Sequence, residues 1–131
     1  MENSLLKVRL SVLWIFVAVS ISAHSILSFM EPEMLQQVLS GEMAWGSGMM
    51  FFMALFWWVP LVMAVLTVTL KDVANRWANM ILGIVFTLFN IVHLMEHFAQ
   101  PSIHQLLIVC STIVVTALIF WFALRWPKQE V

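Results

Sequence analysis

The chain has 131 residues, enough for one domain, and 63% of them are hydrophobic while only 10% are charged. A water-soluble domain carries roughly 25% charged residues, so this composition excludes an ordinary soluble globular protein. The net charge of -1 says little by itself. The single cysteine, Cys110, excludes an internal disulfide and any Cys-x-x-Cys redox or zinc motif.

Four apolar segments are each long enough for a spanning helix, which needs about 20 mostly apolar residues. They cover about residues 6–30, 44–70, 77–98 and 103–126. The runs are too uniformly apolar for the alternating strands of a membrane barrel. The sequence therefore predicts an all-α fold with one transmembrane domain over residues 1–131. We expect an integral membrane, antiparallel four-helix bundle in which helices that follow one another in sequence are neighbours.

The connection after the first segment has a helical pattern of its own. Pro32 suits a first helical turn and Gly41 suits a stop. Between them, apolar residues recur at helical spacing: Met34, Leu35, Val38 and Leu39. We expect a short interfacial helix over about residues 32–40, which lies across the outer mouth of the bundle.

The charged residues separate to the two ends of such a bundle. The basic residues all fall at one end: Lys7, Arg9, Lys71, Arg76, Arg125 and Lys128. The other end holds acidic residues instead: Glu31, Glu33, Glu42 and Glu96. Cytoplasmic loops of membrane proteins carry the excess of lysine and arginine. We therefore expect cytoplasmic N- and C-termini. By the same rule, Trp77 and Trp126, beside basic residues, are expected at the inner interface.

Polar residues gather in the outer half of the predicted bundle. Counting about 1.5 Å per residue from the basic anchors puts His24, Asn90 and His93 in one layer, with His97 and His104 above it. On the third segment one helical face carries Gly83, Phe86, Asn90, His93 and His97, and on the fourth His104, Ile108, Ser111 and Val115 align. Polar groups avoid lipid, so both faces are expected to point inward.

These histidines predict a transition-metal site. His93 and His97, four residues apart, can chelate one ion from a single helix, and imidazole suits zinc, copper and iron. Glu96, His24, His104 or a methionine of the second segment would complete the ligand set. Met49 and Met53 are expected in or just above the histidine layer. The alternative is that His93 and Asn90 only hydrogen-bond between helices.

Two further cofactor chemistries are compatible with the same residues. A b-type haem needs one imidazole from each of two facing helices, which His24 and His93 satisfy, with Asn90 beside them. His93-Leu-Met-Glu96-His97 also matches H-x-x-E-H, the inverzincin pattern, in which a glutamate is the general base. That pattern needs an acidic third ligand downstream. The only acid after His97 is Glu130, at the opposite end, which argues against a protease.

One motif carries a resemblance to a known family. The third segment opens with Asn75-Arg76-Trp77-Ala78-Asn79 and continues Met80-Ile-Leu-Gly83. With its four-helix topology, the chain resembles the DoxX-like group of small bacterial membrane proteins, mostly of unknown function. The resemblance implies a bacterial inner-membrane setting and a redox role, and no site residues. Independently, Arg76 suits lipid phosphate, and Asn75 or Asn79 suits a helix cap.

The leading functional prediction is a small membrane protein that binds a transition metal or haem in an outer, histidine-lined pocket. One alternative is a non-catalytic membrane subunit of a homo-oligomer or of a larger complex. Another is a membrane enzyme that uses His93 and Glu96 as acid and base on a lipid or small molecule. The lipid bilayer is an expected partner, and nucleic acid is not.

Overall fold

The computed structural model of the protein describes residues 2–43, 45–99 and 101–127. These residues form α1 (Glu2–Met30), α2 (Pro32–Ser40), α3 (Ser47–Thr69), α4 (Asp72–His97) and α5 (Ile103–Leu124), without a strand. The all-α class and the short helix after the first long one are confirmed. Three positions used in the predictions, Ala44, Lys128 and Glu130, lie outside the described residues.

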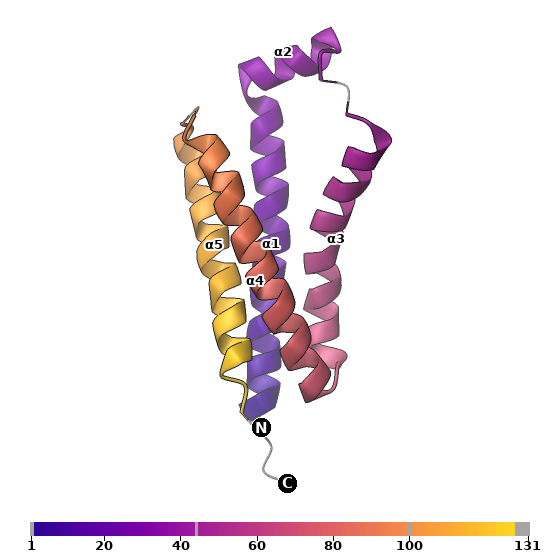
Figure 1. Ribbon diagram of the computed structural model, residues 1–131, viewed down its shortest axis with the longest axis vertical. Coiled ribbons are helices and arrows are strands. Elements are labelled where there is room, and N and C mark those ends of the chain that lie inside the picture. Colours follow the sequence, from indigo (N-terminus) through magenta and orange to yellow (C-terminus); the bar gives the residue numbers. More distant parts are fainter. Residues whose placement is uncertain (1, 44, 100, 128–131) are drawn as a thin grey trace.

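The four long helices α1, α3, α4 and α5 are each long and apolar enough to cross a membrane. The chain runs up α1, across α2, down α3, up α4 and down α5 (Figure 1). Helix α1 packs against both α3 and α5, and α4 packs against α5. The consecutive helices α3 and α4 come close at few backbone points, but their side chains meet, with the ring centroids of Phe56 and Phe86 4.7 Å apart. Most of the close approaches of α3 are to α1.

The junction of α3 and α4 is tied to the start of α1. The Lys7 ammonium donates to the Leu70 carbonyl oxygen at 2.8 Å and lies 2.8 Å from an Asp72 carboxylate oxygen. Helix α4 begins at Asp72 rather than at about residue 77, because an acidic residue in the first turn complements the helix dipole. We call this end of the molecule, with Lys7, Lys71 and Arg125, the basic end.

Asn75 and Asn79 are fully buried, and they join three helices at the basic end. Asn75 Nδ2 donates to the Thr67 carbonyl oxygen of α3 at 2.5 Å. Asn79 Oδ1 accepts from Trp14 Nε1 of α1 at 2.7 Å. The prediction that one of them caps the helix is wrong, because α4 starts three or more residues earlier, at Asp72. Their amides satisfy buried polar groups on neighbouring helices instead.

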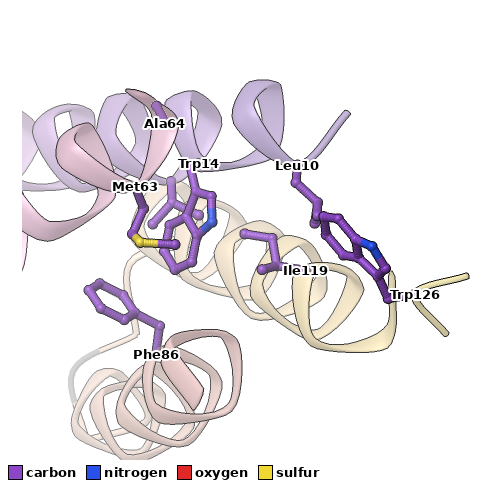
Figure 2. Packing of buried hydrophobic residues seen from close by; sticks show 8 residues of the cluster. Leu10, Trp14, Met63, Ala64, Phe86, Ile119 and Trp126 are labelled. Carbon is purple, nitrogen blue, oxygen red and sulfur yellow. The ribbon is translucent and has the colours of Figure 1, made fainter. Parts of the chain in front are cut away.

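The hydrophobic core lies in the same part of the bundle. Trp14 has no exposed surface and packs between Met63 of α3 and Ile119 of α5 (Figure 2). Its ring meets Phe86 of α4 edge-on, with the ring centroids 5.6 Å apart. Trp126, which was expected at a lipid interface, is buried in this core. All four long helices therefore meet around Trp14.

Helices α4 and α5 approach each other closely at Gly83. A Cβ atom at this position would stand 2.9 Å from the Phe120 backbone nitrogen, so only glycine permits the contact. Close by, Thr87 Oγ1 donates to Thr116 Oγ1 at 3.0 Å. A small residue and a hydroxyl pair are typical of helix contacts in lipid. The outward faces of the long helices carry large apolar residues, such as Val12, Val19, Phe51, Val65, Ile81, Val92 and Leu107.

Candidate metal centre

Three histidines converge at the end of the bundle opposite the basic end, which we call the histidine end. His24 comes from α1, and His93 and His97 come from α4. His93 Nε2 lies 2.9 Å from His24 Nε2 and 3.2 Å from His97 Nε2. One ligand atom from each residue lies within 4.8 Å of the other two. The structure thus brings together three of the four histidines singled out from the sequence.

The His97 ring reaches the His93 ring, although His97 lies one helical turn further along α4. Side chains on a helix tilt toward its N-terminus. The N-terminus of α4 is at the basic end, so the His97 ring is directed down toward His93. The ring centroids of His24 and His97 are 5.1 Å apart, and those of His93 and His97 are 4.7 Å apart.

The separations between these nitrogens are close to those of a metal site. Zinc binds histidine nitrogen at about 2.0–2.1 Å in tetrahedral geometry, which separates two ligand nitrogens by about 3.3 Å. The observed distances of 2.9 and 3.2 Å differ from this value by less than half an ångström. The three rings stand at 80° to 89° to one another. Ligands from two helices therefore already surround one point.

Glu96 holds the His93 ring in place. Its carboxylate oxygen Oε2 lies 3.0 Å from Nδ1 of His93, which is one helical turn earlier in α4. A carboxylate at Nδ1 favours a proton on that nitrogen and leaves the Nε2 lone pair free. This is the arrangement in which metal-bound histidines are usually oriented. Glu96 thus supports the cluster through His93.

Gln105 of α5 is a residue that the sequence interpretation missed. It is almost fully buried, and its Nε2 donates to Ser28 Oγ at 2.9 Å and lies 3.5 Å from the His24 carbonyl oxygen. Two buried atoms here lack a hydrogen-bond partner in the described part of the chain, His24 Nδ1 and Gln105 Oε1. A buried glutamine within an apolar helix was the available signal, since such a residue needs partners.

The inward face of α5 is rotated by one residue from the predicted face. The buried residues are Gln105, Val109, Thr112, Thr116, Ile119 and Ala123. His104 consequently lies away from the cluster and is half-exposed. Its Nε2 is 3.0 Å from a Glu31 carboxylate oxygen, and Ser102 is its other neighbour. The structure therefore does not bring His104 to the other three histidines.

Asn90 lies in the predicted layer, one turn below His93. It is buried, and its Nδ2 donates to the Phe86 carbonyl oxygen of its own helix at 2.7 Å. Asn90 makes no side-chain hydrogen bond to another helix within the described residues, so the predicted role as an interhelical link is wrong. Asn90 faces the cavity described next.

A cavity of about 780 Å³ opens beside the histidines. One wall is polar and includes His24, His93 and Asn90 with serines of α1. The facing wall is apolar and consists mainly of α3 residues: Met49, Phe52, Met53, Ala54, Phe56 and Trp57. Met49 and Met53 thus line the same cavity as the histidines. The cavity exists because α3 packs on α1 and stands off from α4.

Comparison with known proteins gives a family without an assigned activity. No curated protein and no solved structure matches the chain. That family neither supports nor conflicts with the resemblance to the DoxX-like group. A family model matches residues 3–131, nearly the whole chain, and on that basis the protein belongs to DUF6326, a family of unknown function.

Proposed function

We propose that this protein is an integral membrane protein that binds a divalent transition metal ion through His24, His93 and His97. The four long apolar helices, with apolar outward faces, support the membrane setting. The convergence of three Nε2 atoms from α1 and α4 carries the metal assignment. Imidazole ligands in near-tetrahedral spacing favour zinc, with copper and iron as the other candidates. The basic end faces the cytoplasm by the positive-inside rule.

The hydrogen-bond inventory favours a metal over a metal-free cluster of three neutral imidazoles. When the neutral His93 ring carries its proton on Nδ1 and donates it to Glu96, its one ring lone pair is on Nε2. Without metal, that lone pair would accept hydrogen bonds from both His24 and His97. His24 Nδ1 would then be an unprotonated buried nitrogen without a donor. Such an unsatisfied buried group costs about 1–3 kcal/mol.

A bound metal ion removes this conflict. All three Nε2 lone pairs would point to the ion, and His24 would carry its proton on Nδ1. That proton needs an acceptor, and Gln105 Oε1 is a buried acceptor without a partner in the described chain. Gln105 already contacts the His24 backbone. Metal-bound histidines almost always donate their second N–H to such a group.

A haem fits the cluster less well than a metal ion. Iron would lie between two imidazoles on opposite sides, so the two nitrogens would stand about 4 Å apart. His24 Nε2 and His93 Nε2 are 2.9 Å apart, and the His97 ring occupies the space beside them. Three protein ligands leave a fourth position for another molecule, as in catalytic rather than structural zinc sites. The redox role that the DoxX-like resemblance implies would require copper or iron.

The test is a zinc titration of the purified protein in detergent, with occupancy measured by elemental analysis. We expect one zinc ion per chain. Replacing His24, His93 or His97 with alanine weakens binding by about 100-fold or more, since two remaining ligands hold zinc poorly. Glu96→Gln weakens binding by about 10-fold. Occupancy also falls at acidic pH, because ligation requires neutral imidazole.

His104→Ala is the matched control, because His104 lies at the same end of the bundle but outside the cluster. It should bind zinc like the wild type. Full zinc occupancy in a double variant, His93→Ala with His97→Ala, would show that the site is elsewhere. Absence of stoichiometric zinc, copper or iron in the wild type after loading would refute the proposal.

A further inference from the structure

We propose that the cavity beside the histidines binds an apolar molecule headed by a hydroxyl group, a lipid alcohol, with the hydroxyl at the metal. The proposal rests on the proposed metal site for the position of the head group. The cavity, the chemistry of its two walls and its access from outside the bundle carry the choice of ligand.

The side chains of the cavity wall disfavour a phosphate or sulfate head group. The described lining residues include no lysine and no arginine, and Glu96 at the rim is their only acid. A phosphate or sulfate head would therefore meet no side chain that can pair with it apart from the metal. Burying a charge without a partner is costly. An uncharged head group is the better match.

The apolar wall is suited to a hydrocarbon body. Met49, Phe52 and Trp57 of α3 line the cavity and are each about half-exposed. Helix α3 stands off from α4, so these side chains are reached from the outside of the bundle. In the proposed membrane setting, that outside is lipid. A volume of about 780 Å³ is within the usual range for pockets that bind small molecules.

Two serines of the polar wall present hydrogen-bond acceptors to the cavity. Ser22 Oγ donates to the Ala18 carbonyl oxygen at 2.8 Å, and Ser25 Oγ donates to the Ile21 carbonyl oxygen at 2.9 Å. Their protons are used within α1, so only lone pairs face a ligand. One N–H of the Asn90 amide is used on its own helix, which leaves its second N–H as a donor and Oδ1 as an acceptor.

A hydroxyl head group can bind the metal and also donate a hydrogen bond to an acceptor of this wall. Its oxygen has a lone pair for the open position of the metal, and its proton can be donated to an acceptor such as Asn90 Oδ1. A ketone, an ester or an ether offers an oxygen but no proton. It would leave the acceptors of the polar wall unpaired, which is penalised in an apolar site. The cavity thus distinguishes an alcohol from its ether.

The experiment uses the full-length protein in lipid nanodiscs, loaded with Co²⁺, whose visible absorption reports its ligands and geometry. The probe is 1-decanol, and decyl methyl ether is its matched control. We expect decanol to change the cobalt spectrum and to bind at least 10-fold more tightly than the ether. Ala54→Trp, which fills the cavity, should reduce decanol binding at least 10-fold. Leu55→Trp, at the next position but outside the lining, should leave it unchanged.

The outcomes separate the two proposals. Failure to take up cobalt or zinc in the absence of decanol refutes the metal site, and the hydroxyl position falls with it. Normal metal uptake with equal binding of decanol and its ether overturns the lipid alcohol alone. Normal metal uptake with decanol binding that Ala54→Trp does not reduce overturns the assignment of this cavity.

Discussion

The two ends of this small bundle solve the burial of polar groups in opposite ways. At the basic end, Asn75, Asn79, Thr67 and Trp14 bond to one another across α1, α3 and α4. At the histidine end, the Nε2 atoms of His24, His93 and His97 face one another beside a cavity. These four residues of the basic end are thus paired within the bundle, whereas two buried polar atoms of the histidine end, His24 Nδ1 and Gln105 Oε1, have no partner within the described residues.

The difference follows from how α3 is held. At the basic end, the Leu70–Lys71 junction and the Lys7 contacts keep α3 and α4 against α1. At the histidine end, α3 follows α1 along the chain after α2, and it contacts α4 through the rings of Phe52, Phe56 and Phe89. Stability is thus concentrated at one end, and the other end has room for a ligand.

The largest difference in unfolding free energy between variants at the two ends is expected when matched alanines of α3 are replaced by tryptophan. Ala64 is buried in the core around Trp14, so Ala64→Trp should cost more than about 3 kcal/mol of unfolding free energy through overpacking. Ala54 lines the cavity, so Ala54→Trp should cost less than about 1 kcal/mol. Denaturant titration of both variants in detergent measures the difference. Equal destabilisation would mean that the cavity is not open space.

An intermediate difference in unfolding free energy is expected when two asparagines of α4 are each replaced by alanine. Asn79→Ala removes the acceptor of Trp14 Nε1 and should cost about 2 kcal/mol, because it leaves a buried donor unpaired. Asn90→Ala should cost under about 1 kcal/mol, because Asn90 bonds only to its own helix. The same denaturant titration compares them. A larger cost for Asn90 would show that the histidine end is as tightly packed as the basic end.

The smallest difference in stability is expected when two glycines are each replaced by alanine. Gly83→Ala should destabilise the protein by about 1–2 kcal/mol, since the new Cβ would meet the Phe120 backbone. Gly48→Ala, in the first turn of α3, should be neutral or stabilise by a few tenths of a kcal/mol, because nothing lies within 4 Å and alanine favours helix. Thermal unfolding of the two variants measures this. A stabilising Gly83→Ala would contradict the close approach of α4 and α5.

Much of the fold was predictable because apolar runs long enough to cross a bilayer, and residues that favour turns, are recognised from the local sequence. The helix over Pro32–Ser40, with Gly41 at its end in the left-handed conformation, follows from its own residues. The separation of basic and acidic ends likewise follows from the positions of the charged residues in the sequence. The shared face of Asn90, His93 and His97 follows from helical periodicity alone.

The tertiary structure decided which of these faces meet. The rotation of α5 that buries Gln105 and turns His104 toward Glu31 depends on how α5 packs against α1 and α4, and periodicity does not specify it. The same holds for Asn75 and Asn79, which suit a helix cap by sequence but bond across helices. A sequence determines which side chains share a helix face, because that depends on bonds within the helix. Which faces come together depends on packing among all helices at once.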